Sequence, residues 1–293
     1  MMYSPQVETR TQSKGQRGGF TLVELLVVIS IIAVLLTVLI PALQVAKQQA
    51  MGAVCLSNQR TLSLAYTMYT DDSNGQLVGS YCLPLGSSAP YRDPWVCPPT
   101  AIDGTFLTRG SKTGEGGDPA TLEERLRGLR EGKLFPYAES TDVYHCPGDR
   151  RQFEGTYYGD SPVYQMYRTY SIQLGLNNGW SKSLTRMSAV EHPEETYTFV
   201  EEYYDGHVTN YNGGFLLDPI YNAGSWWSVI AIWHNDVGTL AYADGHAERR
   251  KWVDERTIDL KYSRLNCYQP DNLDLEYMHR HYAVKGDVKW YEW

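Results

Sequence analysis

A long apolar segment without a polar face lies near the N-terminus of the chain. No formal charge occurs from Leu25 to Ala46, and only Ser30, Thr37 and Gln44 interrupt the apolar side chains. At about 1.5 Å rise per residue this run forms a helix of about 33 Å, enough to cross a hydrocarbon core of about 30 Å. The alternative is a helix in the core of a soluble bundle, but such helices keep a polar stripe. The pattern therefore predicts a membrane span.

Beyond Pro41 the pattern stays helical but becomes amphipathic. Apolar residues recur at mixed three- and four-residue spacing to about Thr70, which predicts one helix from Phe20 to Thr70 whose second half packs on a domain. The acidic and glycine-containing run Asp71 to Gly75 predicts its end. The same run could be considered a calcium loop, but it lacks the spacing and the downstream glutamate of an EF-hand.

After residue 75 the pattern of apolar and polar residues divides the chain into three further regions. Residues 76–166 contain many Pro, Gly and Ser residues and predict irregular loops, with one short amphipathic helix at Pro119 to Glu131. Residues 167–253 alternate in the manner of antiparallel strands, and residues 254–293 form a polar, aromatic extension with a short helix around Leu273 to His281. The expected strands are Tyr167 to Leu174, Glu195 to Glu202, Ser228 to His234, Val237 to Ala243 and His246 to Val253.

One hairpin is predicted with its turn type. Asp244-Gly245 between the last two strands favours a type I′ turn, and the alternation after it is typical of an exposed edge strand. The fold class expected from these patterns is α+β, with a long N-terminal helix packed on an antiparallel β-sheet with extended loops. Its expected parts are a leader (1–19), a membrane helix (20–46), an amphipathic half with its turn (47–75) and a globular domain (76–293).

The front edge of the apolar segment carries details that a simple anchor does not explain. Gly19 precedes Phe20, and the segment before them holds three basic residues and one acidic residue. Glu24 lies inside the apolar run, where a central carboxylate costs about 3 kcal/mol on insertion scales and less near the end. Pro41, near the far end, removes a backbone donor and can kink the helix. Because the helix itself offers Glu24 no cationic partner, we expect that partner to come from elsewhere.

The residues G-F-T-L-V-E-L-L-V-V-I resemble the type III signal of type IV pilins and type II secretion pseudopilins, a similarity that covers Gly18 to Gln59. The resemblance implies that a prepilin peptidase cleaves between Gly19 and Phe20 and methylates the new amino group. It also implies that Glu24 of one subunit faces the amino group of Phe20 on its neighbour, with Pro41 as part of the assembly helix. Its partners would be the peptidase, other pilin or pseudopilin subunits and the bacterial inner membrane.

The distribution of charge predicts the orientation of the chain in the membrane and argues against nucleic acid as a partner. The basic leader predicts a cytoplasmic N-terminus and a periplasmic C-terminal domain, with later passage of the subunit into the filament. The formal net charge of −8 argues against non-specific nucleic-acid binding, because it leaves no basic patch to neutralise phosphates.

The five cysteines would then face an oxidising compartment, where disulfides are expected. Sequence does not choose among the pairings, and the absence of a CxxC pair argues against a zinc ribbon. Cys146, next to His145, could be read as part of a metal pair, but pairing with another cysteine is favoured. The disulfide candidates are Cys55, Cys82, Cys97, Cys146 and Cys267.

A second motif lies near the end of the predicted sheet. His234 is followed, after nine residues, by Asp244-Gly245, and together with the segments Cys55 to Gly75 and Val143 to Arg151 this is similar to the prepilin-associated H-X9-DG proteins. Structural hydrogen bonding by His234 and a turn at Asp244 is the simpler interpretation. The alternative is a divalent cation site, calcium if carboxylates dominate, for which the candidate ligands are His234, Asp244, Glu201 and Glu202.

The function predicted from these observations is structural. We expect a subunit, in a minor position, of a type IV pilus or a type II secretion pseudopilus, without a cofactor and without enzymatic activity, because no nucleophile elbow or HExxH motif occurs. The alternatives are a membrane-tethered binding or adhesion module, favoured by the 23 tyrosines and eight tryptophans, and a tethered enzyme. Glu24 discriminates between them, since a tether does not need it.

Overall fold

The computed structural model describes residues 20–81, 93–106, 121–149, 168–177, 183–203, 213–217, 224–262 and 267–284. The chain divides into two compact units, Met1–Val45 and Ala46–Trp293. The long helix α1 (Leu22–Asp72) begins in the first unit and ends in the second, so the predicted helix is confirmed to within two residues at each end.

The remaining elements all lie in the second unit. The helices and 3-10 turns are α2 (Leu122–Arg130), α3 (Phe135–Ala138), η1 (Asp142–Tyr144), η2 (Met187–Ala189), α5 (Glu255–Ile258), η4 (Asp259–Tyr262) and α6 (Leu273–Arg280). The strands are β1 (Tyr170–Gln173), β2 (Tyr197–Glu201), β3 (Gly214–Phe215), β4 (Ser225–Trp226), β5 (Val237–Tyr242), β6 (Ala247–Lys251) and β7 (Cys267–Tyr268).

The first unit contains the apolar half of α1. This helix is long and apolar enough to cross a membrane, by length and composition, and its most apolar stretch is not buried by the rest of the described chain. The helical assignment continues through Pro41. An apolar helix without a protein partner is the pattern expected of a membrane-anchored segment.

The second unit is built on a five-stranded sheet with the order β3-β1-β2-β5-β6. All pairings in this sheet are antiparallel except β1 with the short strand β3, which run parallel. The prediction of an antiparallel sheet is therefore correct for its four main strands, and β3 was not foreseen.

One predicted strand is wrong. Ser228 to His234 forms only an isolated bridge between Ile230 and Glu202. The reason is that β5 already occupies this edge of β2, pairing Leu240 with Val200. The 228–234 segment pairs only at the end of β2, where Ala231 donates its backbone N–H to the carbonyl of Glu201, the last residue of the strand (2.9 Å).

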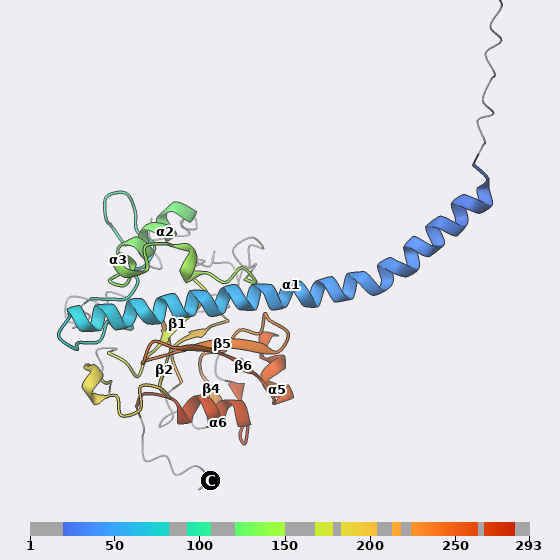
Figure 1. Cartoon of the computed structure of the whole chain (residues 1–293). Helices are drawn as coiled ribbons and strands as arrows, with labels where there is room; N and C mark the ends of the chain where they lie inside the picture. Colours follow the sequence, from blue (N-terminus) through green and yellow to red (C-terminus); the bar gives the residue numbers. More distant parts are fainter. Residues whose placement is uncertain are drawn as a thin grey trace, which may run out of the picture. The chain divides into compact units, whose positions relative to one another are not determined.

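Both faces of the sheet are covered (Figure 1). Neighbouring residues of a strand point to opposite faces, and Phe199 packs in one apolar cluster while Val200 packs in another. The first cluster includes Tyr66 of α1, whose ring meets Phe199 edge-on with centroids 6.2 Å apart. The second includes Met278 of α6. The predicted helix near the C-terminus therefore forms, and it closes the face of the sheet opposite to α1.

Polar side chains of α1 also bond directly to the sheet. The Gln59 amide donates to the carbonyl of Thr239 (2.8 Å), and the Ser63 hydroxyl donates to the carbonyl of Tyr242 (2.5 Å). These bonds fix the second half of α1 over β5.

The hairpin between β5 and β6 differs from the predicted turn type. Gly245 has a positive φ of 96°, whereas Asp244 does not, and Gly245 donates its N–H to the carbonyl of Tyr242 (3.1 Å). This is a type I turn followed by a left-handed glycine, not a type I′ turn, which needs two positive φ angles. The strand after it, β6, lies at the sheet edge and is largely exposed, as predicted.

Candidate functional site

The first candidate site is the start of α1. Glu24 accepts hydrogen bonds from the backbone N–H of Thr21 (2.9 Å) and from its hydroxyl (2.7 Å). Thr21 in turn accepts from the N–H of Glu24 (3.2 Å), so the two residues cap the helix. The helix thus supplies hydrogen-bond donors to Glu24, although it supplies no positive charge. Phe20 is 73% exposed, and Gly19 lies outside the described residues.

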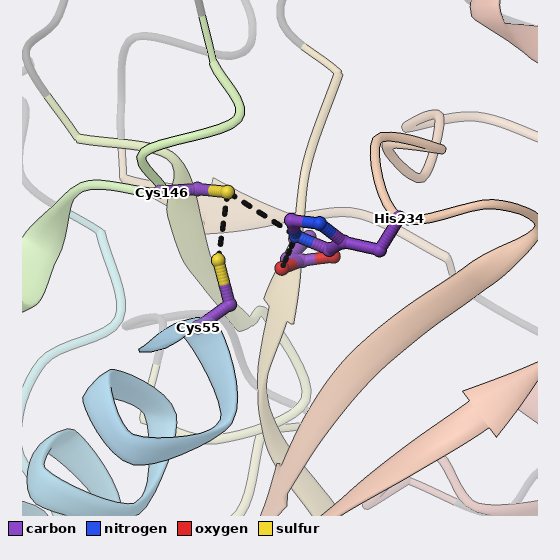
Figure 2. Close-up of side chains that lie close together, drawn as sticks. Cys55, Cys146 and His234 are labelled. Atoms are coloured by element: carbon purple, nitrogen blue, oxygen red, sulfur yellow. Dashed lines mark hydrogen bonds and ion pairs between the residues drawn. The ribbon is translucent and has the colours of Figure 1, made fainter. Parts of the chain in front are cut away.

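The second candidate site is a buried group of four side chains in the second unit: Cys55, Cys146, Glu201 and His234. Their ligand atoms lie within 4.8 Å of one another, and each residue is at most 1% exposed. Figure 2 shows the two sulfur atoms and the imidazole of His234 directed toward one another. The Sγ atoms are 2.7 Å apart, Cys146 Sγ lies 3.3 Å from His234 Nε2, and His234 Nε2 lies 3.2 Å from Glu201 Oε1. We call these four residues the thiol cluster.

Each member of the thiol cluster comes from a different part of the fold. Cys55 is on the buried face of α1, one turn before Gln59. Cys146 follows η1 in a turn closed by the N–H of Asp149, which donates to the Cys146 carbonyl (2.9 Å). Glu201 ends β2, and His234 lies in the segment before β5. Only the tertiary fold brings the four side chains together.

Polar groups around the thiol cluster orient two of its members. The Thr239 hydroxyl donates to Glu201 Oε1 (2.9 Å), and the N–H of Gly148 donates to Cys146 Sγ (3.2 Å). Within the described chain, Glu201 Oε2 is buried without a hydrogen-bond partner. An unsatisfied buried carboxylate oxygen costs about 1–3 kcal/mol or more, which makes this atom a feature that needs an explanation.

Burial and mutual contact shift the pKa values in the thiol cluster. The pKa of the Cys55 thiol is raised well above its ordinary value by its hydrogen bond with Cys146 and by burial. Burial lowers the pKa of His234, but hydrogen bonds with Cys55 and Glu201 outweigh it and raise the value to about 10.

The cation site predicted from the sequence is only half assembled. His234 and Glu201 come together, but Asp244 lies at the β5–β6 turn, where it pairs with His246 (2.6 Å). The side chain of Glu202 contacts Ser171 and lies 4.0 Å from Arg168. Asp244 does not reach His234 because the extended strand β5 lies between them. Glu202 does not join Glu201 because neighbouring residues along a strand point to opposite faces of the sheet.

Sequence reasoning did not place the two cysteines beside Glu201 and His234. Both cysteines are disulfide candidates from the sequence, and Cys146 was also considered in a metal pair with His145. A spacing rule could not connect Cys55 and Cys146 with Glu201 and His234, because the four residues are scattered along the chain. The proximity of His145 and Cys146 was the one local signal, but the imidazole that contacts Cys146 Sγ is that of His234. Of the other candidates, Cys97 is buried, Cys267 is half-buried in β7, and Cys82 lies outside the described residues.

A comparison with protein-family models identifies the N-terminal segment. The model of the prokaryotic N-terminal methylation motif matches residues 14–40. With the long apolar helix, this match shows that the chain carries a type IV pilin-like prepilin signal, as the sequence predicted. The signal supports a precursor of the type IV pilin or pseudopilin type, and it implies processing by a prepilin peptidase and assembly with other pilin subunits.

The match reaches Ile40 within α1 and ends before Cys55, the first residue of the thiol cluster. Comparisons with curated proteins and with solved structures gave no significant match.

Proposed function

We propose that this protein is a structural subunit, in a minor position, of a type IV pilus or a type II secretion pseudopilus. The observation that carries the proposal is the apolar half of α1. Its large apolar side chains are exposed from Phe20 to Val45, and Glu24 near its start is the single carboxylate among them. A helix that is apolar all round is stable in a bilayer or among other apolar helices. A filament subunit is first stored in the membrane and then packed among the helices of other subunits, so it needs a helix that is stable in both.

Glu24 supplies the register for assembly. In the free subunit its carboxylate is held by the neutral donors of Thr21. Cleavage before Phe20 would create a cationic amino group, whose charge adds a Coulombic attraction to the carboxylate that the neutral donors of Thr21 lack. Glu24 of one subunit would exchange Thr21 for the amino group of its neighbour, and a slipped register would leave both charges unpaired in an apolar setting.

The basic residues before Phe20 favour a leader in the cytoplasm and a single pass through the inner membrane, with the second unit in the periplasm. The size of the second unit, Ala46–Trp293, favours a minor or tip position over a repeating one. The proposed role is structural and not catalytic, and the acidic net charge disfavours nucleic acid as a ligand.

The first test is the N-terminus of the protein purified from membranes. Mass spectrometry is expected to find a chain that begins at Phe20 with a methylated amino group. A chain with an intact leader would refute the assignment as a processed prepilin.

The second test is a substitution of Glu24 that preserves membrane insertion. Glu24→Leu is expected to leave the protein in the membrane and to remove it from sheared filaments, because the pair with the neighbouring amino group is lost. Thr37→Leu is the matched control: it also removes one polar group from the apolar half, but the Thr37 hydroxyl bonds only to the carbonyl of Val34 in its own helix (2.7 Å). Filaments that contain the Glu24→Leu protein at the level of the control would sink the subunit proposal.

A further inference from the structure

We propose that the thiol cluster binds a structural zinc ion through Cys55 Sγ, Cys146 Sγ, His234 Nε2 and a carboxylate oxygen of Glu201. The four ligands come from α1, the turn after η1, the end of β2 and the segment before β5. Figure 2 shows how the sulfur atoms and the imidazole converge from separate elements on one point. This inference concerns the second unit alone and does not depend on the assembly proposed above.

The chemistry of the ligands selects the metal. Calcium and magnesium take oxygen ligands in larger numbers, and the thiol cluster offers a single carboxylate. Zinc is bound by a mixture of thiolate, imidazole and carboxylate, usually four ligands in a tetrahedron. The ligand set therefore argues for zinc and against the calcium that a carboxylate-rich site would have favoured.

The distances fit a tetrahedral site after a small adjustment. With bonds of about 2.3 Å to sulfur and about 2.0 Å to nitrogen or oxygen, neighbouring ligand atoms of a tetrahedron lie about 3.3–3.8 Å apart, and two sulfur atoms lie at the upper end of this range. The observed separations of Cys146 Sγ from His234 Nε2 and of His234 Nε2 from Glu201 Oε1 are 3.3 and 3.2 Å. The two sulfur atoms, 2.7 Å apart, must separate by about 1 Å to reach the spacing of two thiolates on one zinc ion.

A bound cation would stabilise the thiol cluster because its polar and ionisable groups are buried. Two thiols, a carboxylate and an imidazole lie together at no more than 1% exposure, and Glu201 Oε2 has no hydrogen-bond partner in the described chain. A divalent cation would displace the thiol protons and compensate the negative charge of the ligands. The surroundings are arranged for this, since Gly148 N–H donates to Cys146 Sγ and the Thr239 hydroxyl holds Glu201, as outer partners of metal ligands do.

The site would be structural because four protein ligands leave no open position for a substrate or water. Its effect would be to join the buried half of α1 to β2 and to the turn at Cys146. His234 of the H-x9-DG segment then acts as a ligand, while Asp244 and Gly245 make the turn.

A disulfide between Cys55 and Cys146 is the competing use of the two sulfur atoms. It requires them to approach by about 0.7 Å to reach an S–S bond of about 2.0 Å. We favour zinc because a disulfide uses only two of the four converging side chains and leaves Glu201 Oε2 buried without a hydrogen-bond partner in the described chain.

The experiment measures metal and thiol state in the same full-length protein, purified in detergent without chelator and with free thiols blocked at lysis. We expect about one zinc per chain by elemental analysis, and Cys55 and Cys146 that resist alkylation until a chelator is added. Cys146→Ser and His234→Gln should each lower the zinc content at least about tenfold, as loss of a ligand does. Cys97→Ser, which removes a buried thiol outside the thiol cluster, should retain the zinc.

A measurement on the unaltered protein keeps the test independent of how the variants fold. Cobalt exchanged into the wild-type protein should produce the near-ultraviolet absorption of thiolate bound to cobalt. The proposal is overturned if the wild-type protein as isolated contains a Cys55–Cys146 disulfide by non-reducing peptide mapping, or if its zinc content is no higher than that of Cys146→Ser.

Discussion

His279 on α6 is a buried titratable residue that the proposed functions do not use. It is 3% exposed, and burial lowers its pKa from 6.5 to about 4. The folded protein therefore holds this imidazole neutral over a pH range in which the unfolded chain binds a proton. The sign follows from proton linkage: stability is complete above pH 6.5 and falls as the pH is lowered toward 4.

His279→Gln should reduce this loss of stability in acid. The wild-type free energy of unfolding should decrease relative to the variant by about 1.4 kcal/mol for each pH unit between 6.5 and 4. Denaturant titrations of the full-length protein in detergent, repeated across this range, measure the difference between the two proteins. Parallel profiles would show that His279 is not protonated differently in the folded and unfolded states.

At the scale of elements, the end of α2 is packed directly against backbone. An added Cβ at Gly128 would lie 2.2 Å from the carbonyl oxygen of Pro98, and one at Gly132 would lie 2.3 Å from that of Trp95. Gly128 lies in the last turn of α2 and Gly132 lies two residues beyond its end, and both are in close contact with the backbone of the 95–98 segment. The N–H of Cys97 donates to the carbonyl of Gly128 (2.9 Å), which fixes the approach.

Gly132→Ala should therefore destabilise the second unit by about 2 kcal/mol or more, because backbone atoms cannot move aside as a flexible side chain can. Glu131→Ala, at the neighbouring exposed position, should change stability by less than about 0.5 kcal/mol. Unfolding can be followed by tryptophan fluorescence, since Trp95 is fully buried beside this contact. Equal stabilities of the two variants would contradict the close packing.

At the scale of the whole molecule, α1 serves two units in different ways. Its first half contributes exposed apolar side chains to the Met1–Val45 unit. Its second half places Leu62, Ala65 and Tyr66 in the core of the Ala46–Trp293 unit, each at most 1% exposed. The second half is thus part of the globular fold and not a spacer.

A chain that begins at Ala46 should consequently be soluble without detergent and should unfold cooperatively. A chain that begins at Leu77 should aggregate, because removing the rest of α1 exposes the apolar cluster around Phe199 to water. Gel filtration and thermal unfolding of the two truncated proteins measure the difference. A soluble, cooperatively folding Leu77 chain would show that the second half of α1 is dispensable for the core.

The sequence alone determined the local features. The apolar run before Ala46, the helix to Asp72, the strands β1, β2, β5 and β6 and helix α6 follow from periodicity, because each pattern reports which face of one element is buried. The prepilin signal is equally local, since its motif occupies one continuous stretch, residues 14–40, with Phe20 and Glu24 only four positions apart.

Tertiary structure decided what the local pattern leaves open. The 228–234 segment has the composition of a strand, but β5 occupies the edge of β2 at which it would have paired. The thiol cluster is the clearest case: His234 and Glu201 were identified by residue type, but their partners proved to be Cys55 and Cys146, not Asp244 and Glu202. Side chains so far apart in sequence meet only because the sheet register and the packing of α1 place them at one point, and no spacing along the chain encodes that distance.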